Sequence, residues 1–123
     1  ERAIESAGGI DLELLGIGRN GHIGFNEPGA DLHTRTRRVE LHAWTRADAA
    51  AAFGGLEHVP TRGITMGIAT ILAARRVRML AFGVRKAPLV ARTLRAAPDP
   101  AWPASYVRLH ADARLVVDRD AAP

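Results

Sequence analysis

The chain has 123 residues, of which 47% are hydrophobic and 24% are charged, and these proportions are ordinary for a soluble globular fold. The absence of cysteine excludes disulfides and thiolate metal sites. The chain contains no run of about 18 apolar residues, so no membrane-spanning helix is expected. The net charge is +4, but the arginines are scattered, Lys86 is the only lysine and 5% of residues are aromatic, so no nucleic-acid surface is expected.

Short apolar runs alternate with helical patterns in the first half of the chain, which is typical of an α/β fold. In chain order we expect a helix end over 1–7, a strand over 11–18, a strand over 37–41 and a helix over 46–53. The strand over 11–18 is apolar enough to be buried on both faces. Thr45 is expected to cap the helix that follows it, and Gly54-Gly55 to end that helix.

The same alternation continues through the second half of the chain. It predicts a short extended piece over 64–66, a helix over 67–74, a strand over 77–82, a helix over 86–97, a helical turn over 104–109 and a strand over 114–117. Leu89, Val90 and Leu94 are expected to form the inward face of the helix over 86–97. Right-handed crossovers between parallel strands are the expected topology.

The most informative segment is the glycine-rich loop from Gly16 to Gly29, GIGRNGHIGFNEPG. Its glycines predict backbone folded tightly around a small polar ligand, with Gly18 and Gly21 binding substrate. The spacing of Gly16, Gly18 and Gly21 also fits the dinucleotide-binding fingerprint, which requires a helix to open at the third glycine. Residues 22–36 contain Pro28 and no apolar repeat at helical spacing, so a helix, and with it a nucleotide, is disfavoured.

His22 is the best candidate for proton transfer, because an imidazole with a pKa of about 6.5 both gives and accepts a proton near neutral pH. An isolated histidine in a glycine turn is usually structural, but Glu27 follows five residues later. A carboxylate that lies close to an imidazole can orient it and stabilise its protonated form, and this short separation in sequence allows such a contact. No metal site is expected, because no ligand spacing links this pair to the other histidines, His33, His42, His58 and His110.

Lys86 is the second candidate. It follows a strand that ends at Gly83 and stands at the start of an expected helix, where free backbone N–H groups favour an anion. A cation is mildly unfavourable in that position, and Lys86 is the only lysine in a chain whose other basic residues are arginines. We therefore interpret Lys86 as a phosphate-binding residue rather than as a solvated surface lysine.

The segment from Leu15 to Gly29 resembles the signature of glucosamine-6-phosphate deaminases, and the related 6-phosphogluconolactonases share only its Gly-His part. The likeness extends from Glu1 to about Ala121, through RTR at 35–37, VP at 59–60, ITMG at 64–67, GVRKA at 83–87, PAS at 103–105 and LH at 109–110. The resemblance implies a doubly wound, mainly parallel Rossmann-like sheet with helices on both faces. It also implies that residues 1–123 are a single partial domain, the C-terminal half of such an enzyme.

The resemblance further implies that His22 accepts and donates the proton during opening of a sugar ring, supported by Asn20 and Glu27, and that Lys86 contacts the substrate phosphate. The implied activity is aldose–ketose isomerisation with deamination, from glucosamine 6-phosphate to fructose 6-phosphate and ammonia, without a cofactor. A cytoplasmic location is expected because the chain has no cysteine. The aspartate that abstracts the C1/C2 proton belongs to the N-terminal half, so these residues alone are expected to be catalytically incomplete.

Two positions depart from the family pattern. Asn20 stands where aspartate is frequent, and Ala51 stands where an arginine for the phosphate is usual. Both departures favour an alternative function, a non-catalytic phosphosugar-binding module or regulator of the same fold. The expected ligand in either case is a small phosphosugar, and no nucleic acid or membrane is expected as a partner. The sequence is compatible with a homo-oligomer.

Overall fold

The structure, a computed structural model, describes all residues from 1 to 123. Its elements are α1 (Arg2–Ser6), β1 (Glu13–Gly16), β2 (Arg37–Glu40), α2 (Ala43–Phe53), η1 (Leu56–His58), β3 (Arg62–Thr65), α3 (Ile68–Leu72), β4 (Val77–Ala81), η2 (Val84–Lys86), α4 (Ala87–Arg95), η3 (Pro103–Leu109) and β5 (Ala113–Val117). The α and η labels denote α-helices and 3₁₀ helices. None of the helices has the length and apolarity that a membrane-spanning segment needs.

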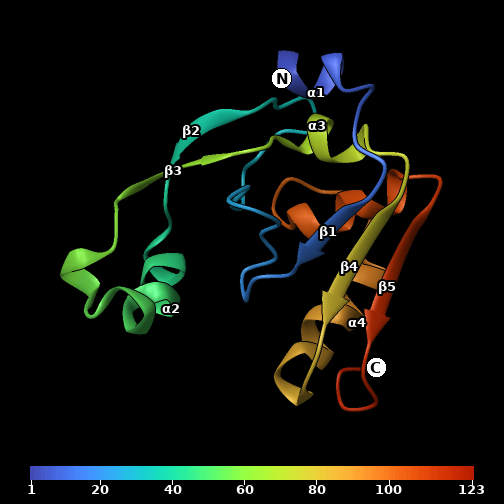
Figure 1. Cartoon of the computed structure of the whole chain (residues 1–123). Coiled ribbons are helices and arrows are strands. Elements are labelled where there is room, and N and C mark those ends of the chain that lie inside the picture. Colours follow the sequence, from blue (N-terminus) through green and yellow to red (C-terminus); the bar gives the residue numbers. More distant parts are fainter.

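Three parallel strands form the central sheet, in the order β1–β4–β5 (Figure 1). The register aligns Leu15 with Met79 and Met79 with Leu115, so these side chains share one face of the sheet. On β4, Val77 and Met79 have at most 1% of their surface exposed. This face carries the core, a cluster of 15 buried residues that also includes residues of α3, α4 and η3.

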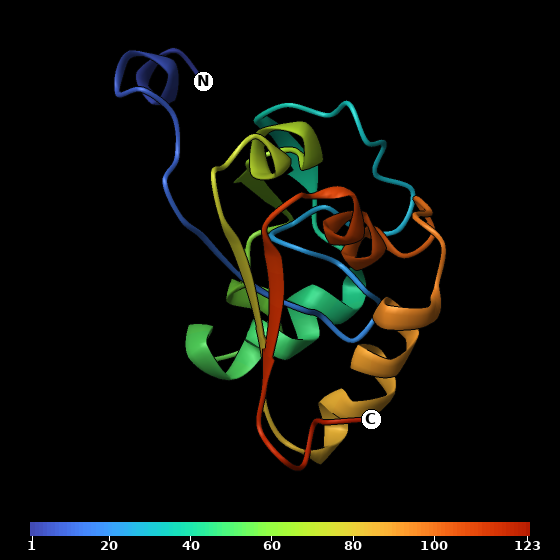
Figure 2. The same ribbon diagram turned by 90° about the vertical axis from the view of Figure 1, so that its right-hand side faces the viewer.

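The helices α4 and η3 lie to one side of the strands, and α1 lies on the other side (Figure 2). The predicted α/β class with a mainly parallel sheet is confirmed. The expectation that the strand at 11–18 is buried on both faces is wrong for the described chain, because Leu14 is 60% exposed. Leu14 aligns with Arg78 and Arg114 on the face opposite the core, and no described helix packs over these residues.

Residues 37–65 form an arm that extends away from the central sheet (Figure 1). The antiparallel pair β2–β3 makes its stem, and α2 and η1 lie at its far end. We call the remaining residues the body. Thr45 does not cap α2 as predicted: the helix begins at Ala43, and the side chain of His42 accepts a hydrogen bond from the backbone N–H of Trp44. Gly54 ends α2 in the left-handed conformation, as predicted.

In α4 the predicted inward face is partly wrong. Val90 is buried, but Leu94 is 50% exposed, and Thr93 points inward in its place. The reason is the indole of Trp102, just before η3, whose Nε1 donates a hydrogen bond to the Thr93 hydroxyl. The other predicted elements appear within a few residues of their expected limits, and residues 22–36 contain no helix. The geometric requirement of the dinucleotide fingerprint is therefore not met.

Candidate active site

A cleft of about 940 Å³ opens where the carboxyl ends of β1 and β4 meet. Its walls come from the loop that follows β1, from α2 on the arm, and from η2 with the first turn of α4. In parallel α/β sheets, ligands bind beyond the carboxyl ends of the strands, because the loops there converge. The structure thus brings the predicted residues Gly18, His22 and Lys86 to one cleft, although they are up to 68 positions apart in the chain.

The loop after β1 is held in place by Asn26, which is fully buried. Its side-chain amide donates to the carbonyl oxygens of Ile23 (3.0 Å) and Met66 (2.8 Å), and its oxygen accepts from the guanidinium of Arg37 (2.9 Å). All of its polar atoms are therefore bonded within the protein, as a buried amide requires. This asparagine fixes the loop and leaves the neighbouring Glu27 free to face the histidine.

A chain of hydrogen bonds connects His22, Asn20 and Glu27. The side-chain oxygen of Asn20 lies 2.7 Å from His22 Nδ1, and Asn20 Nδ2 donates to Glu27 Oε2 at 2.7 Å. Glu27 Oε2 is 3.4 Å from His22 Nδ1, and both side chains are largely buried, with 18% of His22 and 14% of Glu27 exposed. The amide thus lies between the two groups predicted to act together.

This arrangement sets the tautomer of His22. Because Asn20 Nδ2 faces the carboxylate, the atom directed to the imidazole is the amide oxygen, which only accepts. Nδ1 therefore carries the hydrogen, and Nε2 keeps its lone pair. No protein group bonds to Nε2, and the side chain lines the cleft. Burial lowers the pKa of His22 below its usual value against the opposing effect of Glu27, so the imidazole is a neutral base at pH 7.

Glu27 is kept ionised by its hydrogen-bond donors. Burial alone would raise the pKa of this carboxyl, but hydrogen bonds from the side chains of Thr45 and Asn20 outweigh it, and the pKa is lowered. The hydroxyl of Thr45 donates to Oε1 at 2.5 Å. Sequence reasoning missed this role, since it assigned Thr45 to the helix cap. The only signal in the sequence was a hydroxyl residue at the start of a helix, and this signal does not distinguish capping the helix from donating to Glu27.

The two glycines predicted to bind substrate have different surroundings. Gly18 lines the cleft, and a Cβ at this position would lie within 2.3 Å of the His22 ring atoms, so only glycine fits beside the imidazole. Gly21 has a φ of +81°, and a Cβ there would lie 2.4 Å from the ring of Trp102. It is not among the residues of the cleft, so its visible function is close packing in a left-handed turn.

Lys86 lies in the opposite wall of the cleft, as the last residue of η2. Its ammonium group donates to the backbone oxygen of Ile17 at 2.7 Å, which ties η2 to the end of β1. One of its three N–H bonds is occupied in this way, and two are left for a ligand. Ala51, the position at which the family pattern expects an arginine, does not line the cleft, whereas Asp48 and Ala49 of the same helix do.

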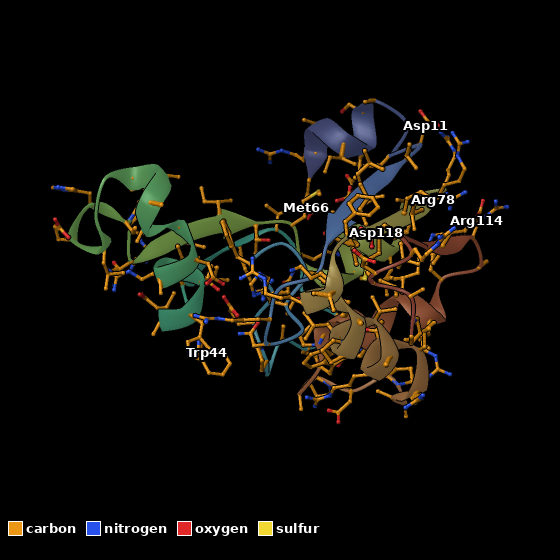
Figure 3. The ribbon with its side chains drawn as sticks, turned by 90° about the horizontal axis from the view of Figure 1, so that it is seen from below. Asp11, Trp44, Met66, Arg78, Arg114 and Asp118 are labelled. Carbon is orange, nitrogen blue, oxygen red and sulfur yellow. The ribbon has the colours of Figure 1, made fainter.

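Arg19 and Asp48 are site residues that sequence reasoning did not identify. Arg19 Nε lies 3.4 Å from Asp48 Oδ2, and its guanidinium lies 5.0 Å from the ring centre of Trp44. Trp44 projects from α2 and is half exposed (Figure 3). These contacts join the loop after β1 to α2 across the cleft. No group of three or more histidine, cysteine or carboxylate side chains is placed to hold a metal ion.

A parallel α/β sheet with a histidine and a lysine lining a cleft at its carboxyl edge defines an α/β protein with a polar ligand site. Comparison with known proteins identifies it further. The chain belongs to the family of glucosamine-6-phosphate isomerases and 6-phosphogluconolactonases, whose sequence model matches residues 1–117.

Two relatives of high similarity carry the same description. The chain is 48% identical over 122 residues to a glucosamine-6-phosphate deaminase of Corynebacterium urealyticum and 51% identical over 122 residues to one of Rhodopirellula baltica. These alignments cover 99% of this chain and 48% and 49% of the relatives, so the chain spans about half the length of the curated relatives it matches. A solved structure described as a monomeric glucosamine-6-phosphate deaminase superposes with a TM-score of 0.95 at 44% identity, covering 98% of this chain and 50% of that one.

Proposed function

We propose that the protein acts in the deamination and isomerisation of glucosamine 6-phosphate, giving fructose 6-phosphate and ammonia. The observation that carries this proposal is the chain of hydrogen bonds from Glu27 through Asn20 to Nδ1 of His22, a side chain that lines the cleft and whose Nε2 has no partner in the protein. The similarity to relatives named glucosamine-6-phosphate deaminase supports the choice of substrate. The 6-phosphogluconolactonase from Trypanosoma brucei shares the fold alone, with a TM-score of 0.65 at 23% identity.

The first step assigned to these residues is opening of the sugar ring. Nε2 of His22 takes the proton from the anomeric hydroxyl as the bond between C1 and the ring oxygen breaks, and the resulting imidazolium returns a proton to that ring oxygen. The carboxylate of Glu27, 3.4 Å from Nδ1, stabilises the imidazolium while it exists. Asn20 holds the ring in position by its hydrogen bond but contributes no charge.

The later steps need a base, and we propose that it belongs to a part of the enzyme outside residues 1–123, as the family resemblance implies. An aspartate moves the proton between C2 and C1 through an enolamine, and the product is a ketimine at C2. Water adds to this carbon, ammonia leaves, and the ketose phosphate remains. The substrate's own carbonyl and amine accept the electrons, so no cofactor takes part in this scheme. Lys86 binds the phosphate with the two N–H bonds that Ile17 leaves free.

The same proposal places the protein in cytoplasmic amino sugar metabolism, as a hydrolase that acts on a phosphosugar. A chain without cysteine fits a reducing compartment. One similar structure is described as monomeric, and we propose no oligomer for this protein on that basis.

The direct test is an assay of the full-length protein with glucosamine 6-phosphate and no added nicotinamide or metal. We expect equal amounts of ammonia and ketose phosphate. Activity that requires a nicotinamide, or that appears only with a 6-phosphogluconolactone, would contradict the proposal. Binding of the phosphosugar without release of ammonia would assign the protein to the non-catalytic alternative.

A further inference from the structure

The cleft is lined by three cationic side chains, Arg19, Arg85 and Lys86. They differ in the ion pairs and hydrogen bonds that they already make within the protein. The guanidinium of Arg19 is paired with Asp48 and also donates to the backbone oxygen of Trp44 at 3.3 Å. Lys86 uses one N–H bond for Ile17. Arg85 takes part in no ion pair, hydrogen bond or cation–π contact, so its whole guanidinium is available to a ligand.

The turn that carries Arg85 is held in place even though the side chain is free. Gly83, with a φ of +84°, donates its N–H to both carboxylate oxygens of Asp118, at 3.0 and 2.9 Å. Lys86 N–H donates to the Gly83 carbonyl at 2.8 Å, which closes the turn. Figure 3 shows Asp118 within the body, where the last strand ends. The backbone that presents Arg85 is therefore fixed between the ends of β4 and β5.

The wall that α2 contributes to the cleft has no cationic side chain. From α2 only Thr45, Asp48 and Ala49 line it. Arg46 of the same helix points to the outer side, where its guanidinium donates to the backbone oxygens of Leu56 and Val59 at 3.3 Å. A phosphate monoester carries a charge of about −1.5 to −2 at pH 7, which the single ammonium of Lys86 does not neutralise.

We propose that Arg85 is a phosphate-binding residue and forms, together with Lys86, the subsite for the phosphate group of the ligand. This inference rests on the proposed function, since the phosphate is that of the sugar substrate. Lys86 supplies a point charge at a fixed position, and Arg85 supplies a planar fork that binds two phosphate oxygens at once. The pair makes the cleft select phosphorylated over unphosphorylated sugars.

The test compares Arg85→Ala, Arg85→Lys and the control Arg95→Ala in the full-length protein. Arg95 lies in the last turn of α4, is exposed, does not line the cleft, and has no ion pair or hydrogen bond. Its replacement therefore changes the net charge equally without touching the site. The first readout is the Kd for inorganic phosphate by titration calorimetry, which requires no turnover. The second is the ratio of kcat/KM for glucosamine 6-phosphate to that for glucosamine.

We expect Arg85→Ala to raise the Kd for phosphate about tenfold, because a charge-assisted contact to a dianion is lost. The ratio of kcat/KM values should fall by a similar factor, Arg85→Lys should recover part of both losses, and Arg95→Ala should change neither. A phosphate Kd that is the same in Arg85→Ala and Arg95→Ala would overturn the inference, even in a protein that releases ammonia. If the wild type releases no ammonia but Arg85→Ala still weakens phosphate binding, the proposed function fails and the subsite stands.

Discussion

The body and the arm use their side chains in opposite ways. All 15 residues of the buried core cluster belong to the body, and none lies between residues 37 and 65. The arm buries Val59 but leaves most of its larger apolar side chains exposed, as in Trp44 at 50%, Phe53 at 48% and Ile64 at 74%. The arm is therefore held to the body by few apolar contacts, and polar contacts must define its position.

Those polar contacts converge on the loop that carries the proposed acid–base group. Thr45 bonds to Glu27, the Thr65 hydroxyl accepts from the N–H of Phe25 at 3.0 Å, and Arg19 pairs with Asp48. The difference between the two regions suggests a division of work. The body supplies the stability and His22, and the arm supplies a hydroxyl that keeps Glu27 ionised. Movement of the arm would therefore change the proton chemistry without unfolding the core.

The largest effect is expected for the body residue at the centre of the mechanism. His22→Gln should lower kcat by about 10²–10⁴-fold, the usual range for positioned acid–base catalysis, and leave phosphate binding nearly intact. Kinetics with glucosamine 6-phosphate and calorimetry with phosphate measure the two parts. Turnover at the wild-type rate would show that ring opening is spontaneous or occurs elsewhere.

Glu27→Gln provides the companion measurement. The Glu27 charge raises the pKa of His22, so its removal lowers that pKa further, and the acid limb of kcat/KM should move to lower pH. The loss in kcat should be smaller than for His22→Gln. The double variant should lose less activation free energy than the two single variants lose together, because the residues act as one unit. Strictly additive effects would mean that they act separately.

The second effect contrasts the stability of the two regions. Ile71→Ala in α3 removes a side chain that is 1% exposed and should lower the free energy of unfolding by about 2–5 kcal/mol. Ile64→Ala in β3 serves as the control, because its side chain is 74% exposed and should change stability by less than about 0.5 kcal/mol. Urea unfolding of both variants measures the difference. Equal losses would show that the arm is packed as tightly as the body.

The third effect concerns Lys86. Lys86→Ala should raise KM for the phosphosugar more than tenfold, since a charge-assisted hydrogen bond is worth about 1.5–3 kcal/mol. The variant also loses the bond to Ile17, so its melting temperature has to be compared with that of the wild type. An unchanged KM would make Lys86 a structural link between η2 and β1.

The smallest effect is expected where the arm meets the body. Thr45→Val keeps the shape of the side chain but removes the hydroxyl that donates to Glu27. The hydrogen bond is worth about 1 kcal/mol, so kcat should fall several-fold. A matched control is Ala47→Ser, which adds a hydroxyl on the same helix at an exposed position outside the cleft. Equal activity of wild type and Thr45→Val would remove the arm from the proton chemistry.

The same variant has a defined pH dependence of stability. The folded-state pKa of Glu27 is lowered, so its contribution is present above the unfolded value of about 4.3 and is lost as the pH falls through the folded value. Thr45→Val raises the folded pKa toward the unfolded one. The difference in the free energy of unfolding between the wild type and Thr45→Val should therefore be largest at pH 7 and should decrease as the solution is acidified. Unfolding curves at several pH values measure it.

Much of the fold could be predicted from local patterns. Short apolar runs between helical patterns located β2, β4 and β5, and Gly54 marked the end of α2, because both signals depend on residues that are near neighbours in the chain. Leu14 and Leu94 were wrongly expected to be buried. Periodicity shows which residues share a face, but a face becomes buried only where another element packs on it.

The candidate site divides in the same way. The sequence by itself determined the order of elements, the loop with His22 and Glu27, and the membership in a family, since these depend on residues that are contiguous or matched in order. The tertiary structure alone decided that Asn20 bonds to both His22 and Glu27, that Thr45 donates across 18 positions, and that Lys86 reaches Ile17 across 69. Hydrogen bonds act over about 3 Å of space whatever the separation in the chain, and only the packing of the sheet, loop and arm brings such atoms together.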